Sequence, residues 1–187
     1  MNTTTIIVIS VLIGIAILGV AALFFFRKRR TEGLRTRFGP EYARAVQEIG
    51  DRRHAEASLE ERKKRVERFK LQPLTPGDHV RFTESWRRIQ GRFVDDPKSA
   101  VTESDQLLGD VMSTRGYPVS DFEQRAADIS VDHPKVVENY RAAHEIALRH
   151  AQGQASTEDL RQAMIHYRTL FVELVSEPDL ASAKVAS

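Results

Sequence analysis

The 187-residue chain contains no cysteine. This absence excludes disulfide bonds, thiolate catalysis, cysteine-ligated zinc, iron–sulfur clusters and a lipid anchor attached to cysteine. Charge is also missing from a long stretch, because none of the first 26 residues carries a charged side chain. The rest of the chain carries 28 basic and 26 acidic side chains, so the net charge is only +2. An uncharged N-terminal segment is therefore followed by a highly charged remainder.

Motifs for catalysis or metal binding are missing too. None of the six histidines belongs to a Glu-x-x-His pair of the di-iron type or to a His-Glu-x-x-His motif. No glycine-rich phosphate loop occurs. Ser130, Asp132 and His133 have the composition of a catalytic set, but neighbours at one helix start cannot converge on a point. We expect no enzymatic activity and no cofactor or metal. The alternative is a small-ligand or metal-binding domain that uses His133, His144 or His166.

Residues 6–26 form an apolar run in which 15 of 21 residues are Ile, Leu, Val or Phe. As a helix, the run would be about 31 Å long, which matches the hydrocarbon core of a bilayer. A buried core helix would be shorter and would present a polar face. The run predicts a single transmembrane helix, preceded by a short N-terminal tail of residues 1–5.

Four consecutive basic residues, Arg27, Lys28, Arg29 and Arg30, follow the apolar run directly. We expect them to contact the membrane surface. No basic side chain precedes the run, so the positive-inside rule places the N-terminus outside and the later residues in the cytoplasm, at the inner membrane. Cleavage at the small residues Gly19-Val20-Ala21 is the alternative, and it would give an envelope or secreted helical domain. The missing basic residue before the run argues against a cleaved signal peptide.

Residues 27–70 form a basic arm with 15 basic and 8 acidic side chains. We expect residues 41–70 to form one charged juxtamembrane helix if no break interrupts it. Basic residues in this position are attracted to the anionic inner leaflet. Nucleic acid is not expected as a partner, because the basic excess adjoins the membrane and lacks interleaved aromatic residues. The Ser10-x-x-x-Gly14 pair would allow two membrane helices to approach and form a homodimer.

Residues 71–175 predict an all-α bundle of four main helices with a short additional one. Apolar residues recur here with helical period, and no alternating β-pattern of useful length is present. Polar capping residues mark the expected helix starts at Thr75 or Asp78, Asp95-Asp96, Ser120 with Glu123, Asp132-His133, and Ser156. Residues 176–187 have little to pack and predict a flexible tail.

The connector at residues 115–134 combines aromatic residues, prolines, a glycine and charges of both signs. One interpretation is a recognition surface for an unidentified protein partner, because Tyr and Arg dominate the binding energy of interfaces. Its candidate anchors are Arg115, Tyr117, Phe122 and Arg125. The other interpretation is a well-capped connector whose short helix closes one end of the bundle.

Four segments of the chain together resemble a family of bacterial single-pass membrane proteins with no assigned function. These segments are residues 34–42 (LRTRFGPEY), 92–97 (RFVDDP), the connector at 115–134, and 139–144 (NYRAAH). The resemblance covers roughly residues 34–175. It implies a bacterial source and a membrane-anchored helical domain, and it transfers no activity and no catalytic residue. The sequence as a whole therefore predicts a membrane-anchored, non-enzymatic interaction or adaptor protein.

Overall fold

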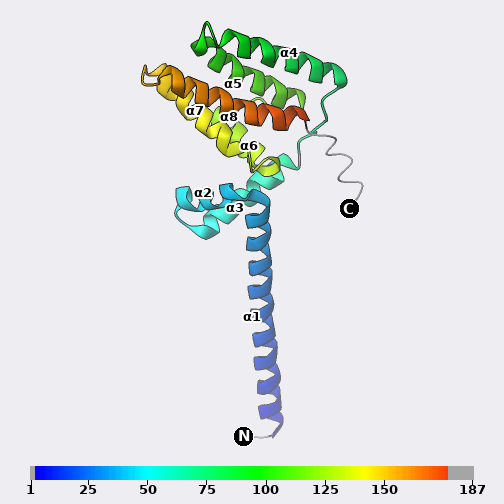
Figure 1. The fold of residues 1–187 in the computed structure, drawn as a ribbon. Helices are drawn as coiled ribbons and strands as arrows, with labels where there is room; N and C mark the ends of the chain where they lie inside the picture. Colours follow the sequence, from blue (N-terminus) through cyan, green and yellow to red (C-terminus); the bar gives the residue numbers. More distant parts are fainter. Residues whose placement is uncertain (1–2, 177–187) are drawn as a thin grey trace. The chain divides into compact units, whose positions relative to one another are not determined.

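A computed structural model describes the backbone of residues 3–176, and the side chains of this range except residues 3–11, 15, 16, 20 and 23. The described residues form α-helices and no strand, which confirms the all-α prediction (Figure 1). The helices are α1 (Thr3–Phe38), α2 (Pro40–Ile49), α3 (Arg52–Val66), α4 (Pro76–Arg92), α5 (Pro97–Thr114), α6 (Phe122–Asp132), α7 (Val137–Ala151) and α8 (Thr157–Ser176). The expected flexible tail lies almost wholly outside the described residues.

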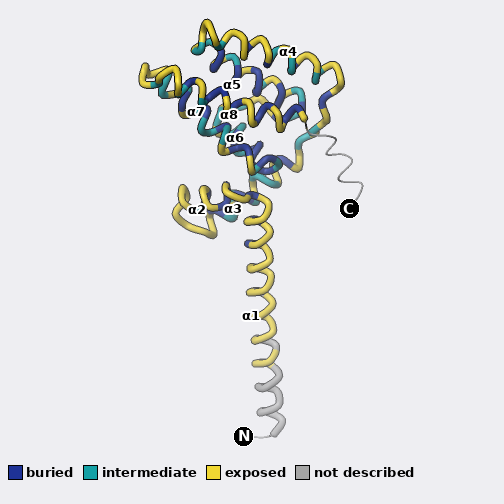
Figure 2. Tube along the Cα trace, in the orientation of Figure 1, coloured by how far each residue is buried: buried dark blue, intermediate teal, exposed yellow. Residues whose placement is uncertain are grey.

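The chain divides into two compact units, one up to residue 57 and one from residue 58 onward. In the first unit α1 packs against α2, and Figure 2 shows α1 exposed along most of its described length. Three buried side chains of α1, those of Thr31, Leu34 and Phe38, recur at helical spacing and form one stripe. Because α1 runs from Thr3 to Phe38, the apolar run and the basic residues that follow it belong to one continuous helix.

The basic arm is not one helix, which corrects that expectation. Gly39 adopts a positive φ of 49° and is followed by Pro40. Proline can start a helix, because an N–H in the first turn would have no partner within the helix. Gly50 ends α2 in the left-handed conformation, with φ 75°, and its N–H donates to the carbonyl of Val46. The two glycines thus separate α1, α2 and α3, and α3 begins at Arg52, two residues after Gly50.

In the second unit α8 packs against both α5 and α7, while α4 packs against α5 and the short α6 packs against α7 (Figure 1). The indole of Trp86 stacks on the ring of Phe171, with centroids 4.8 Å apart, and so joins α4 to α8. Tyr140 and Tyr167 are completely buried at the contact of α7 with α8. These four main helices and one short helix have the arrangement that the sequence predicts.

Helix capping agrees with the sequence at three starts and differs at two. Thr75, Asp96 and Ser156 each accept a backbone N–H of the first turn of their helices, as expected. Asp121, rather than Ser120, caps α6 by accepting the N–H of Gln124 at 2.9 Å.

Asp132 does not cap α7, because the helical hydrogen bonding of α6 continues past it. The N–H of His133 donates to the carbonyl of Ile129 at 2.8 Å. Pro134 then ends that pattern, since it has no N–H to donate. Helix α7 consequently starts after Val136, without a side-chain cap.

The predicted membrane span, residues 6–26, falls partly outside the side chains that the structure describes. Within the described residues, no helix has an apolar stretch long enough to cross a bilayer. Ser10 of the expected Ser10–Gly14 dimer contact also lies outside the described side chains.

Gly116 should be among the glycines least tolerant of substitution. Its φ is 95°, and a Cβ at this position would lie 2.4 Å from the backbone carbonyl oxygen of Lys70. We expect Gly116→Ala to lower the free energy of unfolding by at least about 2 kcal/mol, because backbone strain and a backbone clash add. Gly153→Ala is the matched control, with φ 72° and no heavy atom within 4 Å of the added Cβ. Chemical unfolding of both variants followed by circular dichroism would contradict this account if Gly153→Ala were the more damaging.

Candidate functional site

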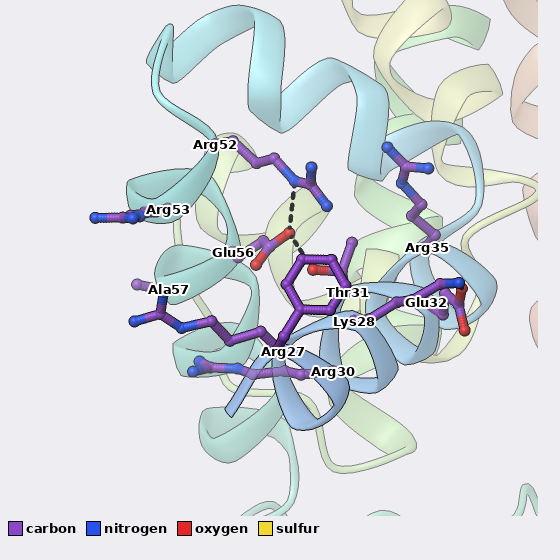
Figure 3. A pocket seen from close by; sticks show the side chains of 11 residues that line it. Arg27, Lys28, Arg30, Thr31, Glu32, Arg35, Arg52, Arg53, Glu56 and Ala57 are labelled. Carbon is purple, nitrogen blue, oxygen red and sulfur yellow. Dashed lines mark hydrogen bonds and ion pairs between the residues drawn. The ribbon is translucent and has the colours of Figure 1, made fainter. Parts of the chain in front are cut away.

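The first unit contains a cavity of about 690 Å³ between α1 and the start of α3 (Figure 3). Most of its lining side chains are basic, and they come from both helices. The lining residues are Phe24, Arg27, Lys28, Arg30, Thr31, Glu32, Arg35, Arg52, Arg53, Glu56 and Ala57. We call this cavity the basic pocket.

The basic pocket is strongly cationic, with six Arg or Lys side chains and two Glu side chains in its lining. Helix α1 contributes four of the cations, and α3 contributes Arg52 and Arg53. In the view of Figure 3 the side chains of Arg27, Arg30 and Arg53 extend in the same direction, although they come from two helices. Like charges that line one cavity repel each other, and an anion in the pocket would reduce that repulsion.

Glu56 holds the walls of the basic pocket together. Its Oε1 atom accepts hydrogen bonds from the Thr31 hydroxyl at 2.9 Å, the Tyr42 hydroxyl at 2.8 Å and the Arg52 Nε at 3.0 Å. These donors lie on α1, α2 and α3 respectively, so one carboxylate connects three helices. Burial alone would raise the pKa of Glu56, but the hydrogen bonds from Tyr42, Thr31 and Arg52 outweigh burial and lower this pKa.

Two other lining residues have partners of their own. The Glu32 carboxylate lies 3.9 Å from the Lys28 ammonium group, one helical turn away, in an exposed ion pair. The Arg35 guanidinium lies over the Tyr42 ring, 5.2 Å from its centroid. Both lining carboxylates are thus engaged by partners within the unit.

Three of the four predicted membrane-surface residues, Arg27, Lys28 and Arg30, line the basic pocket. Arg29 does not, and its guanidinium lies over the ring of Phe25, 4.5 Å from the centroid. All four are exposed. The sequence did not single out the contribution of α3, although Arg52 and Glu56 form an i,i+4 ion pair that was visible in the sequence.

The candidate partner-binding residues are largely interior. Arg115 is 3% exposed, and its Nη1 donates to the backbone carbonyl of Leu174 at 2.6 Å. Tyr117 is 4% exposed, donates its hydroxyl to Asp132 at 3.1 Å and packs edge-on against Phe69. These two side chains therefore hold the connector to the bundle and present no free surface.

Phe122 and Arg125 also make intramolecular contacts. The half-buried Phe122 ring stacks on His144, with centroids 3.5 Å apart. Arg125 Nη2 lies 3.3 Å from the Asp105 carboxylate. All four candidate anchors thus bind the connector to its own bundle, as the interpretation of a capped connector requires.

The three histidines proposed as ligands are not brought together. His133 is buried with its Nδ1 3.5 Å from a Glu173 oxygen, and His166 Nδ1 lies 2.8 Å from the Asn139 side-chain oxygen. Burial lowers the pKa of His144, which favours its neutral form. In the part of the chain that the structure describes, no three metal-ligating side chains form a group.

Glu56→Gln should loosen the first unit, since a neutral amide accepts hydrogen bonds more weakly than a carboxylate. We expect a loss of about 1–3 kcal/mol, measured as faster amide hydrogen exchange over residues 31–57. The folded pKa of Glu56 is below its ordinary value of 4.5, so the carboxylate stabilises the fold fully above that ordinary, unfolded-state pKa. That contribution is lost as the pH falls through the folded pKa.

Glu48→Gln is the matched control, because Glu48 forms only an exposed ion pair with Arg44. Equal exchange rates in the two variants would contradict the conclusion that Glu56 holds α1, α2 and α3 together.

Tyr117→Ala should destabilise the second unit by about 3–5 kcal/mol, as expected when a buried aromatic side chain is removed. Val119, on the same connector, is 88% exposed, and Val119→Ala should change stability by less than about 0.5 kcal/mol. Thermal unfolding of both variants distinguishes a structural connector from an exposed binding loop, for which Tyr117→Ala would leave the melting temperature unchanged.

Comparison of the chain with models of protein families, with curated proteins and with solved structures finds no match. What this protein does is therefore inferred from its own residues.

Proposed function

We propose that the chain is a membrane-anchored, non-enzymatic interaction or adaptor protein. In this proposal residues 6–26 cross the inner membrane of a bacterial cell once, and the helical second unit faces the cytoplasm. The proposal is supported chiefly by α1, which continues without a break from the apolar run into the basic residues.

The described apolar side chains of α1 are widely exposed. Leu18 and Phe24, for example, are each 72% exposed, and five further large apolar side chains of this helix are more than half exposed: Leu12, Ile13, Ile17, Phe25 and Phe26. Contiguous apolar surface of this kind is unfavourable in water and marks a surface that contacts lipid or protein. A lipid environment removes this cost for every side chain around the helix.

The charge pattern supports the orientation. Phe24, Phe25 and Phe26 end the apolar run, and the exposed side chains of Arg27 to Arg30 follow within one helical turn. Cations that directly follow an apolar run are typical of the cytoplasmic end of a membrane helix. An anionic inner leaflet would attract these cations further.

The second unit is the part of the chain to which we assign the interaction role. From residue 58 onward this unit carries 19 basic and 21 acidic side chains, a net charge of −2, so it lacks the basic excess that would attract it to an anionic leaflet. We propose that it binds an unidentified protein partner. The anchors for this partner are not Arg115 and Tyr117, because both are buried.

Reporter fusions after Ser176 test the proposed topology. Green fluorescent protein fluoresces when it is retained in the cytoplasm, whereas alkaline phosphatase is active only outside it. We expect fluorescence without phosphatase activity, with the fusion retained in membranes washed at pH ~11, since a transmembrane helix inserts effectively irreversibly.

Active phosphatase would reverse the orientation and would favour the envelope alternative. Release of the protein by the alkaline wash would overturn the membrane anchor. Replacement of Arg27 to Arg30 by Gln is a useful internal control, because it should weaken the orientation preference without shortening the apolar run.

A further inference from the structure

We infer that the basic pocket binds the phosphate-bearing headgroup of one anionic phospholipid. This inference rests on the proposed membrane anchor and goes beyond it, because a generally basic surface needs no pocket. The pocket adds two features, which are a second wall of cations from α3 and a position next to the end of the apolar run.

Cations on two helices distinguish this pocket from a line of charge along α1. Arg27, Lys28 and Arg30 approach from α1, while Arg53 approaches from α3, 23 residues further along the chain. Guanidinium groups suit phosphate well, because they can donate two parallel hydrogen bonds to its oxygens. A cavity of about 690 Å³ has room for a phosphodiester with its glycerol.

The height of the pocket favours a lipid over a soluble phosphate. The polar headgroup layer extends about 5–7 Å beyond each side of the hydrocarbon core. Arg27 to Arg30 rise only about 4.5 Å along the helix and would lie within this layer. Phe24, the one large apolar side chain among the lining residues, belongs to the run that precedes them. The lining thus combines an apolar ring with cations, as contact with a phospholipid glycerol-phosphate region requires.

The carboxylates in the lining do not oppose this binding. Glu56 is engaged by Thr31, Tyr42 and Arg52, and Glu32 is paired with Lys28. Glu56 also binds the guanidinium of Arg52 at 3.0 Å, and its bond to Thr31 joins α3, which carries Arg53, to α1. The pocket is therefore built before the lipid arrives, which reduces the ordering cost of binding.

Native mass spectrometry of the full-length chain in mixed micelles tests the inference. The measured quantity is the dissociation constant of the first bound lipid, for phosphatidylglycerol and for phosphatidylcholine. We expect phosphatidylglycerol to bind more tightly than phosphatidylcholine, and Arg53→Gln to weaken its binding about tenfold, as expected when one charge-assisted hydrogen bond to the phosphate is lost. Arg53→Lys should restore part of the binding, because an ammonium group keeps the charge but cannot donate two parallel hydrogen bonds.

Arg29→Gln is the matched control, because Arg29 is equally charged and exposed, lies in the basic run and does not line the pocket. We expect it to change the dissociation constant less than twofold. A diffuse surface potential predicts the reverse or an equal effect, since Arg29 is closer than Arg53 to the apolar run. Equal losses in the two variants would overturn the pocket. Unchanged circular dichroism confirms that each variant is folded.

Two further measurements distinguish a lipid site from a site for soluble phosphates and from a failure of the membrane anchor. Glycerophosphoglycerol, the water-soluble headgroup, should compete only weakly; if it bound as tightly as the lipid, the site would be one for soluble phosphates. Retention of the wild-type chain in membranes at pH ~11 with no preference for phosphatidylglycerol would overturn the lipid pocket alone. Release at that pH would overturn the anchor and the pocket together.

Discussion

The Oε1 atom of Glu56 accepts hydrogen bonds from three helices, and the arrangement of the first unit depends on these bonds. Without them, α1 carries a single file of cations and α3 is a short charged helix with little apolar surface of its own. With them, Arg52 and Arg53 lie across a cavity from Arg27 and Arg30. The Glu56 carboxylate thus joins the two walls that carry the cations, and its lowered pKa extends its ionised form to more acidic pH.

The sequence predicts the helical elements of the second unit well, because their signals are local. Thr75, Asp96 and Ser156 each accept a hydrogen bond from the backbone N–H three residues ahead, so both partners lie in one short sequence motif. Where two capping residues are adjacent the sequence is ambiguous, and Asp121 wins over Ser120 because its carboxylate also complements the helix dipole. The same local logic would have found the break in the arm, since Gly50 followed by Asp51 is a typical helix end and start.

The pocket and the burial of the connector are not local, and sequence inspection could not place them. Thr31 and Glu56 are 25 residues apart, and Arg115 contacts Leu174 across 59 residues. Residues such as Arg115 and Tyr117 have the composition of an interface whether they face a partner or their own bundle. Only the burial of the side chains in the folded protein distinguishes these two cases, and here both side chains are buried. The composition of the connector indicates that its side chains make specific contacts, but not whether these contacts are with a partner or with the bundle.

The continuity of α1 from Thr3 to Phe38 has a mechanical consequence. A helix without a proline or a break behaves as a stiff rod, here about 54 Å long. In the proposed membrane setting, the lower half of this rod takes its tilt from the thickness of the bilayer, because a span of fixed length leans further in a thinner membrane. The upper half must lean by the same angle, and Thr31 is rigidly part of it. Bilayer thickness would then be converted into the inclination of the basic pocket, with no hinge to absorb the change.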